Sequence, residues 1–163
     1  MKATEATKRA LIIAPDDAPT AWFLNYRMTV LATAAMTGGA YGLVETLAPA
    51  GESPPLHVHH AEDESFYLIE GRMTFQCGER RFDAGPGSHV FLPRGIPHTF
   101  RVDRAPARFL VIHTPGGREQ FFLDGGRPAE EAGLPPRTPP DIETLKSVAA
   151  RHQIDIVGPP MTS

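Results

Sequence analysis

Short apolar runs separated by turn-forming residues fill the chain between residues 20 and 114. The runs recur at intervals of about 8–12 residues, a spacing typical of antiparallel sandwiches and barrels. The second run is rich in Ala and Leu, which favour helix, but its β-branched residues and the glycine pair that follows it favour a strand. The predicted strands lie within 21–24, 28–35, 41–47, 57–59, 64–70, 73–77, 90–92, 99–102 and 109–113.

The pattern changes after residue 113, where glycines flank an aromatic pair and a proline-rich loop over 134–140 follows. Asp141 can cap a helix that begins after this loop. The residues that would share the apolar face of this helix are Ile142, Leu145, Val148 and Ala149. We therefore expect one short helix near the C-terminus, followed by an apolar tail at 154–157.

These elements predict an all-β sandwich or barrel with a short C-terminal helix. Residues 1–19 are polar and interrupted by Pro15 and Pro19, so we expect a flexible leader there. We assign 20–126 to the β-domain. We expect 127–163 to form a loop and helix packed against it.

Composition and charge narrow the classes of function. The 163 residues suit one domain, and a net charge of −3 without a basic run argues against a nucleic-acid partner. No apolar run approaches the roughly 18 residues of a membrane span, and the N-terminus lacks a signal-peptide core. Cys77 is the single cysteine, so no intrachain disulfide can form and a cytoplasmic location is expected.

Two histidines one residue apart, His57 and His59, are the main chemical feature of the chain. Alternate residues of a strand point to the same face, so both imidazoles can reach one ion, whereas on a helix they would diverge by about 200°. Glu64 follows five residues later, and His98 lies downstream in a segment rich in Gly and Pro. Three imidazoles and one carboxylate in a small β-fold indicate a first-row transition metal.

Two segments that carry these residues resemble the signature motifs of the cupin superfamily. They are GESPPLHVHHAEDESFYLIEG at 51–71 and GSHVFLPRGIPHTF at 87–100. The second motif often ends in Asn, a place held here by Val102. The stretch before the first motif and VIHTPGGREQFF at 111–122 narrow the resemblance to small, single-domain cupins similar to quercetin 2,3-dioxygenase. The resemblance extends over about residues 20–160.

The resemblance implies a single cupin β-barrel built as an antiparallel double-sheet jelly roll. It also implies His57, His59, Glu64 and His98 as ligands of one divalent transition metal. About two positions would stay open on six-coordinate iron, manganese, nickel or cobalt. Zinc is a further option, although four ligands would saturate a tetrahedral zinc ion. In the family, the glutamate ligand also takes a proton from the substrate, so Glu64 is the predicted catalytic residue.

Aromatic and methionine side chains near the ligands are candidates for a substrate pocket. Two of the phenylalanines lie two residues beyond a predicted ligand and therefore on the same strand face. Core packing is the alternative role at each position, because aromatic residues dominate protein cores. The predicted pocket residues are Met28, Phe66, Met73, Phe75 and Phe100.

The remaining histidines and nearby acids have ordinary interpretations. His60 should point away from the ligands, at the surface or behind them. Glu62 and Asp63 read as acids of an exposed turn. His89, His113 and His152 read as structural or packing residues.

Three functions stay open on the sequence alone. The preferred one is a metal-dependent dioxygenase acting on a small hydroxylated aromatic or polyketide-type secondary metabolite, with O₂ as the second substrate. A non-oxidative isomerase, cyclase or dehydratase would use the same metal as a Lewis acid. A small-molecule binding module without turnover is the third. In each case we expect a homodimer, because edge strands need cover and the outer-face residues Tyr67 and Ile69 are apolar.

Overall fold

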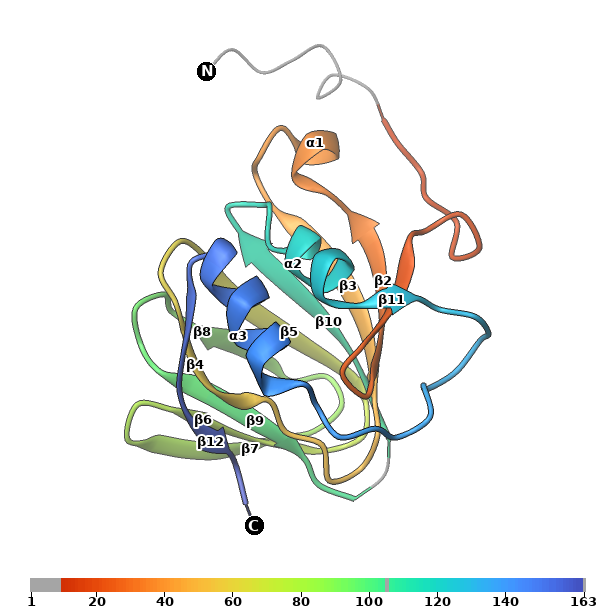
Figure 1. Cartoon of the computed structure of the whole chain (residues 1–163). Coiled ribbons are helices and arrows are strands. Elements are labelled where there is room, and N and C mark those ends of the chain that lie inside the picture. Colours follow the sequence, from red (N-terminus) through yellow and green to blue (C-terminus); the bar gives the residue numbers. More distant parts are fainter. Residues whose placement is uncertain (1–9, 105, 163) are drawn as a thin grey trace.

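The structure, a computed structural model, describes residues 10–104 and 106–162. Two antiparallel sheets of seven and five strands face each other, and helices lie beside them (Figure 1). This arrangement confirms the predicted jelly roll, although the two sheets do not close into a barrel. No helix of the described residues is long and apolar enough to cross a membrane.

The seven-stranded sheet contains β1 (Thr20–Phe23), β2 (Tyr26–Ala32), β3 (Gly42–Ala48), β5 (Asp63–Glu70), β8 (His89–Leu92), β10 (Ala107–Thr114) and β11 (Arg127–Pro128). The five-stranded sheet contains β4 (Pro55–His59), β6 (Met73–Cys77), β7 (Arg80–Ala84), β9 (His98–Val102) and β12 (Ile154–Pro160). The helices are α1 (Ala34–Thr37), α2 (Glu119–Gly125) and α3 (Ile142–Arg151). The strand orders are β11-β1-β2-β3-β10-β5-β8 and β12-β4-β9-β6-β7.

Alternation along the strands fills the space between the sheets. In β10, for example, every second residue is buried, starting at Ala107 and ending at His113. Successive pairings place Phe66 beside Val111 and Val111 beside Val44, so the inward side chains form rows across the seven-stranded sheet. Another of these rows lies at the end of the core and places Glu64 beside His113. This row contains residues of the candidate site.

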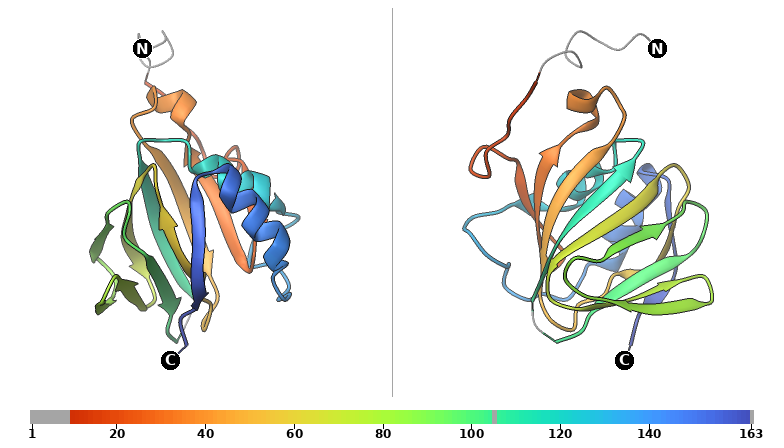
Figure 2. Two further views of the ribbon diagram at one scale, coloured as in Figure 1. Left: turned by 60° about the vertical axis from the view of Figure 1, so that its left-hand side comes forward. Right: turned by 180° about the vertical axis from the view of Figure 1, so that it is seen from behind.

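Helices α2 and α3 bridge the two sheets on one side (Figure 2). Helix α2 contacts β1 and β3 of the larger sheet, and α3 contacts α2 and the edge strand β12 of the smaller sheet. As predicted, Asp141 caps α3, and its carboxylate accepts a hydrogen bond from the Thr144 N–H. Leu145, Val148 and Ala149 of this helix are buried, so its apolar stripe closes the core from the side.

The structure differs from the sequence prediction in several elements, and the strands β7 and β11 were not predicted. The strand predicted over 28–35 ends at Ala32, because Thr33 caps the single-turn helix α1. Helix α2 was not predicted, since its seven residues are too few for a helical period to emerge. The apolar tail forms the strand β12, which pairs with β4. Residues 1–9 of the expected leader lie outside the described part of the chain, and residues 10–19 contain neither helix nor strand.

Gly71 follows β5 in the left-handed region and offers a test of the fold. Its φ is +87°, and a Cβ atom there would lie 2.7 Å from the Cα atom of Ala107. We expect Gly71→Ala to lower the free energy of unfolding by about 3 kcal/mol, from backbone strain and steric overlap together. Urea denaturation measures the change.

Gly51 is the matched control, because its φ is +81° and a Cβ atom there would meet nothing within 4 Å. Gly51→Ala should cost only the left-handed strain, about 1 kcal/mol. Equal losses in the two variants would show that the contact between Gly71 and Ala107 does not constrain the fold.

Candidate metal centre

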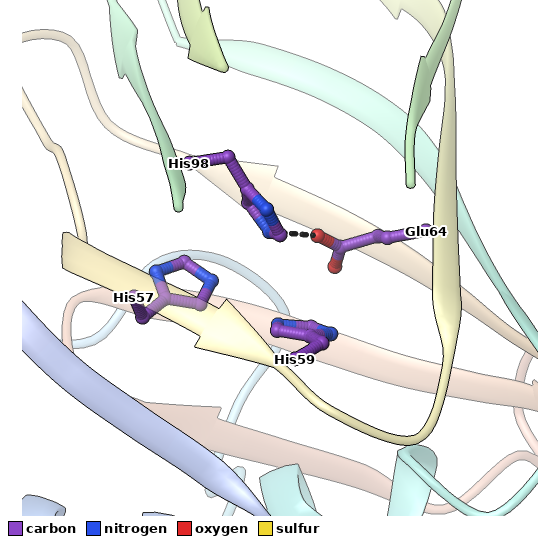
Figure 3. A group of neighbouring side chains, drawn as sticks. All are labelled: His57, His59, Glu64 and His98. Atoms are coloured by element: carbon purple, nitrogen blue, oxygen red, sulfur yellow. Dashed lines mark hydrogen bonds and ion pairs between the residues drawn. The ribbon is translucent and has the colours of Figure 1, made fainter. Parts of the chain in front are cut away.

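The four predicted ligands come together between the two sheets. His57 and His59 lie on the inner face of β4, and His98 opens β9 directly opposite His57. Glu64 reaches them from β5 of the other sheet. One ligand atom from each residue lies within 4.8 Å of the other three, and the side chains point toward one another (Figure 3).

Backbone carbonyls orient two of the three imidazoles. The Nδ1 atom of His57 lies 2.7 Å from the Pro55 carbonyl oxygen, and Nδ1 of His98 lies 3.0 Å from that of Ile96. Each carbonyl can only accept, so each Nδ1 carries the proton and each Nε2 presents a lone pair to the cluster. Such outer hydrogen bonds are typical of histidines that bind metals.

Protein groups alone do not satisfy all the hydrogen-bonding atoms of the cluster. Nε2 of His98 faces Oε2 of Glu64 at 3.2 Å, yet with the proton on Nδ1 both atoms are acceptors. Nδ1 of His59 is buried and has no hydrogen-bond partner among the described residues. A cation between His98 and Glu64 would satisfy both acceptors, and three imidazole nitrogens with one carboxylate oxygen suit a divalent transition metal. The residues present therefore fit the predicted ion.

Burial favours the neutral form of His57 and His59. Burial, together with the neighbouring His98, lowers the pKa of His57 from 6.5 to about 4. Burial likewise lowers the pKa of His59 well below its usual value. Both imidazoles are thus uncharged near pH 7, and the uncharged imidazole is the form that binds a metal.

His113 holds the carboxylate of Glu64 from behind. It is fully buried on β10, and its Nε2 lies 2.9 Å from Oε1 of Glu64. Burial raises the pKa of Glu64, but the neighbouring histidines, including His113 through its hydrogen bond, outweigh it and keep the pKa well below the usual value. From the sequence, His113 was predicted to be a structural residue. Its place beside Glu64 depends on the pairing of β10 with β5, which the sequence pattern does not reveal.

The acids before Glu64 have different roles from those predicted. The interpretation of Glu62 as an exposed acid is wrong, since it is 9% exposed and forms an ion pair with the buried Arg118. Asp63 binds both the backbone N–H and the guanidinium of Arg94. Gly95 of the same turn donates its N–H to the His59 carbonyl at 2.8 Å. The turn that precedes His98 is therefore anchored to both ligand-bearing strands.

The other histidines lie away from the cluster. His60 is exposed and pairs with Asp155, as its outward position on the strand end predicted. His89 is exposed on β8, and His152 follows α3 and contacts Asp124.

A largely apolar cavity opens beside the cluster, with an empty volume of about 690 Å³ that includes its open side. Among the predicted pocket residues, Met28, Phe66 and Phe100 line it. Met73 and Phe75 do not, because they are fully buried on β6 and belong to the core. The lining also includes Tyr26, Arg118, Phe121 and Phe122, which are not among the predicted pocket residues given above.

A family comparison identifies the domain that holds this site. The sequence model of the family described as cupin domain matches residues 43–113. Residues 43–113, somewhat less than half of the chain, thus match a cupin domain. The match spans all four ligand positions, the strands from β4 to β9 and most of β3 and β10, so the cupin resemblance inferred from the two motifs is confirmed.

Individual relatives are more distant. The chain is 29% identical over 101 residues to quercetin 2,3-dioxygenase of Bacillus subtilis, which is 62% of this chain and 30% of that protein. It is 40% identical over 65 residues to dimethylsulfoniopropionate lyase DddQ of Ruegeria pomeroyi, 39% of this chain and 32% of that one. The chain thus spans about a third of the length of these curated relatives.

A solved structure supports the fold. The crystal structure of a predicted oxalate decarboxylase from Thermotoga maritima superposes with a TM-score of 0.57 at 19% identity. The match covers 64% of this chain and 99% of that protein. The two chains share the cupin jelly roll.

The lowered pKa of His57 predicts how the stability of the metal-free protein depends on pH. The unfolded chain binds a proton at this residue below about 6.5, whereas the folded protein binds it only below about 4. Stability should therefore fall as the pH drops from about 6.5 to about 4. Urea unfolding of the wild type and of His57→Gln at several pH values measures this. The variant should show a shallower decline, and equal declines would contradict the shift.

Proposed function

We propose that this protein is a metal-dependent dioxygenase that acts on a small hydroxylated aromatic or polyketide-type metabolite. The observation that carries the proposal is the cluster of three imidazoles and one carboxylate, within 4.8 Å of one another, beside an apolar cavity. The similarity to a quercetin 2,3-dioxygenase supports the choice of chemistry.

Different residues of the chain would bind the metal, transfer the proton and line the substrate pocket in such a reaction. His57, His59, His98 and Glu64 would hold a divalent iron, manganese, nickel or cobalt ion, which supplies open positions for substrate and O₂. Glu64 takes the proton of the substrate hydroxyl group on a carboxylate oxygen, while His113 fixes its other oxygen. We propose that Met28, Phe66 and Phe100 line the substrate pocket and exclude water from it.

A second function is favoured by a different observation. The similarity to the lyase DddQ is higher in identity, although it covers fewer residues. A non-oxidative reaction would use the same ligands around a Lewis-acidic metal, zinc included, and Glu64 would again carry the proton. The two functions differ in their need for O₂.

Turnover with and without O₂ is the experiment that tests the proposal. Protein loaded in turn with iron, manganese, nickel, cobalt or zinc is incubated with a panel of flavonols and hydroxylated aromatic acids. We expect O₂ uptake matched to product with a redox-active metal, and a loss of about 10²–10⁴-fold in kcat for Glu64→Gln. Equal turnover without O₂ would favour the lyase-type function. Saturable binding without any conversion would leave only a binding module.

Metal content provides the control for this experiment. His57→Gln should lose most of the bound metal, because it removes one of four ligands. His60→Gln removes a neighbouring histidine that pairs with Asp155 at the surface, and it should keep the full content. Equal content in the two variants, measured by mass spectrometry, would contradict the assignment of the ligands.

We also propose a homodimer formed through the outer face of the larger sheet. Tyr67 on β5 and Phe91 on β8 are 43% and 54% exposed on this face, on neighbouring strands. Light scattering should give twice the chain mass of 17.7 kDa, and Phe91→Glu should reduce it to that of one chain. A wild-type mass of one chain would contradict the dimer.

A further inference from the structure

Arg118 is a buried cation in the wall of the cavity beside the metal ligands. It is 1% exposed and immediately precedes α2. Its Nη2 donates to Oε2 of Glu62, and its guanidinium carbon lies 5.7 Å from the centre of the Phe121 ring. The remaining nitrogen atoms, Nε and Nη1, are buried and have no hydrogen-bond partner among the described residues.

These free donors call for a ligand more than for a structural explanation. Buried N–H groups without acceptors are costly, and buried polar groups in proteins are nearly always paired. The contact with Glu62 accounts for one nitrogen atom of three and holds the guanidinium in place. The other two donors stay unpaired among the described residues, in a side chain that lines the cavity.

The charge of the site favours a negatively charged ligand. Arg118 is the one cationic side chain among the residues that line the cavity. In the wall of a largely apolar cavity, its guanidinium is the group that would attract an anion.

We propose that the cavity binds an organic carboxylate with an apolar body, and that Arg118 binds its carboxylate group. The apolar walls formed by Phe66, Phe100 and Phe122 suit the body of such a ligand. Binding of a carboxylate at Arg118 does not depend on the proposed reaction. That the bound carboxylate is the substrate rests on the proposed function, and it would narrow the substrate class to carboxylates. Glu62 is a positioning residue, since it orients the guanidinium and leaves its other donors free.

Binding to the metal-free protein tests the role of Arg118 apart from any chemistry at a metal. The probes are acetate, benzoate, 3-phenylpropionate and cinnamate, each compared with its own amide at pH 7. We expect at least one carboxylate to bind about tenfold or more tightly than its amide, because a charge-assisted hydrogen bond forms only with the acid. The same carboxylate should shift the ¹⁵N–¹H resonance of Arg118 Nε. Failure of all four carboxylates, or equal affinity for acids and amides, would overturn the proposal.

Variants separate ligand binding from structural support. Arg118→Gln should abolish the preference for the acid, and Arg81→Gln, which removes an exposed charge, should leave it unchanged. Arg118→Gln can also destabilise the fold by leaving Glu62 buried and unpaired. The double variant Glu62→Gln/Arg118→Gln removes both charges and should show the same loss of preference in a folded protein. A preference retained in the double variant would overturn the proposal.

The variant Glu62→Gln distinguishes two roles of Arg118, ligand binding and support of the fold, because the two roles predict different changes in affinity. If Arg118 binds the ligand, carboxylate affinity should stay equal or rise, because the glutamine amide oxygen can still accept a hydrogen bond from Arg118 and orient it, while the competing negative charge is gone. If the ion pair serves only the fold, this variant should weaken binding of acid and amide alike. A parallel loss for both probes would therefore contradict the proposal, whereas the metal content and O₂ dependence described above test the reaction independently.

Discussion

Glu64 and His98 face each other at 3.2 Å across the space between the two sheets, with lone pairs on both sides. Much of the structure depends on this contact, because it places acceptors from opposite sheets together in a largely apolar interior. Carbonyls behind His57 and His98, and His113 behind Glu64, fix the direction of each acceptor. A divalent cation is the group that relieves the repulsion, so the metal would also join the sheets.

Helices α2 and α3 form part of the wall of the cavity beside the candidate metal centre. Helix α2 brings Phe121 and Phe122 to the cavity, and the residue before it, Arg118, supplies the positive charge. The ion pair with Glu62 connects this helix to the turn between β4 and β5, two residues before Glu64. The wall of the cavity and the ligand set are therefore coupled through one short segment of chain.

The two-sheet β-fold was predictable from local rules, and the four candidate metal ligands from strand alternation together with the cupin motifs that carry them. Alternation on one strand brings His57 and His59 to the same side, and the glycine turns bring the other ligands near. His113, Glu62 and Arg118 were not predictable in the same way, since strand pairing and the placement of α2 bring them to the site. Inward-facing residues such as Phe75 also could not be divided between core and cavity, because both share one strand face.

The most direct measurement is anomalous X-ray diffraction from crystals of the protein loaded with cobalt or nickel. The account predicts one anomalous peak per chain, within about 2.0–2.3 Å of a nitrogen atom of each of His57, His59 and His98 and of a Glu64 carboxylate oxygen. A peak elsewhere, or none at this position in fully loaded protein, would contradict the assignment of a metal centre between the two sheets.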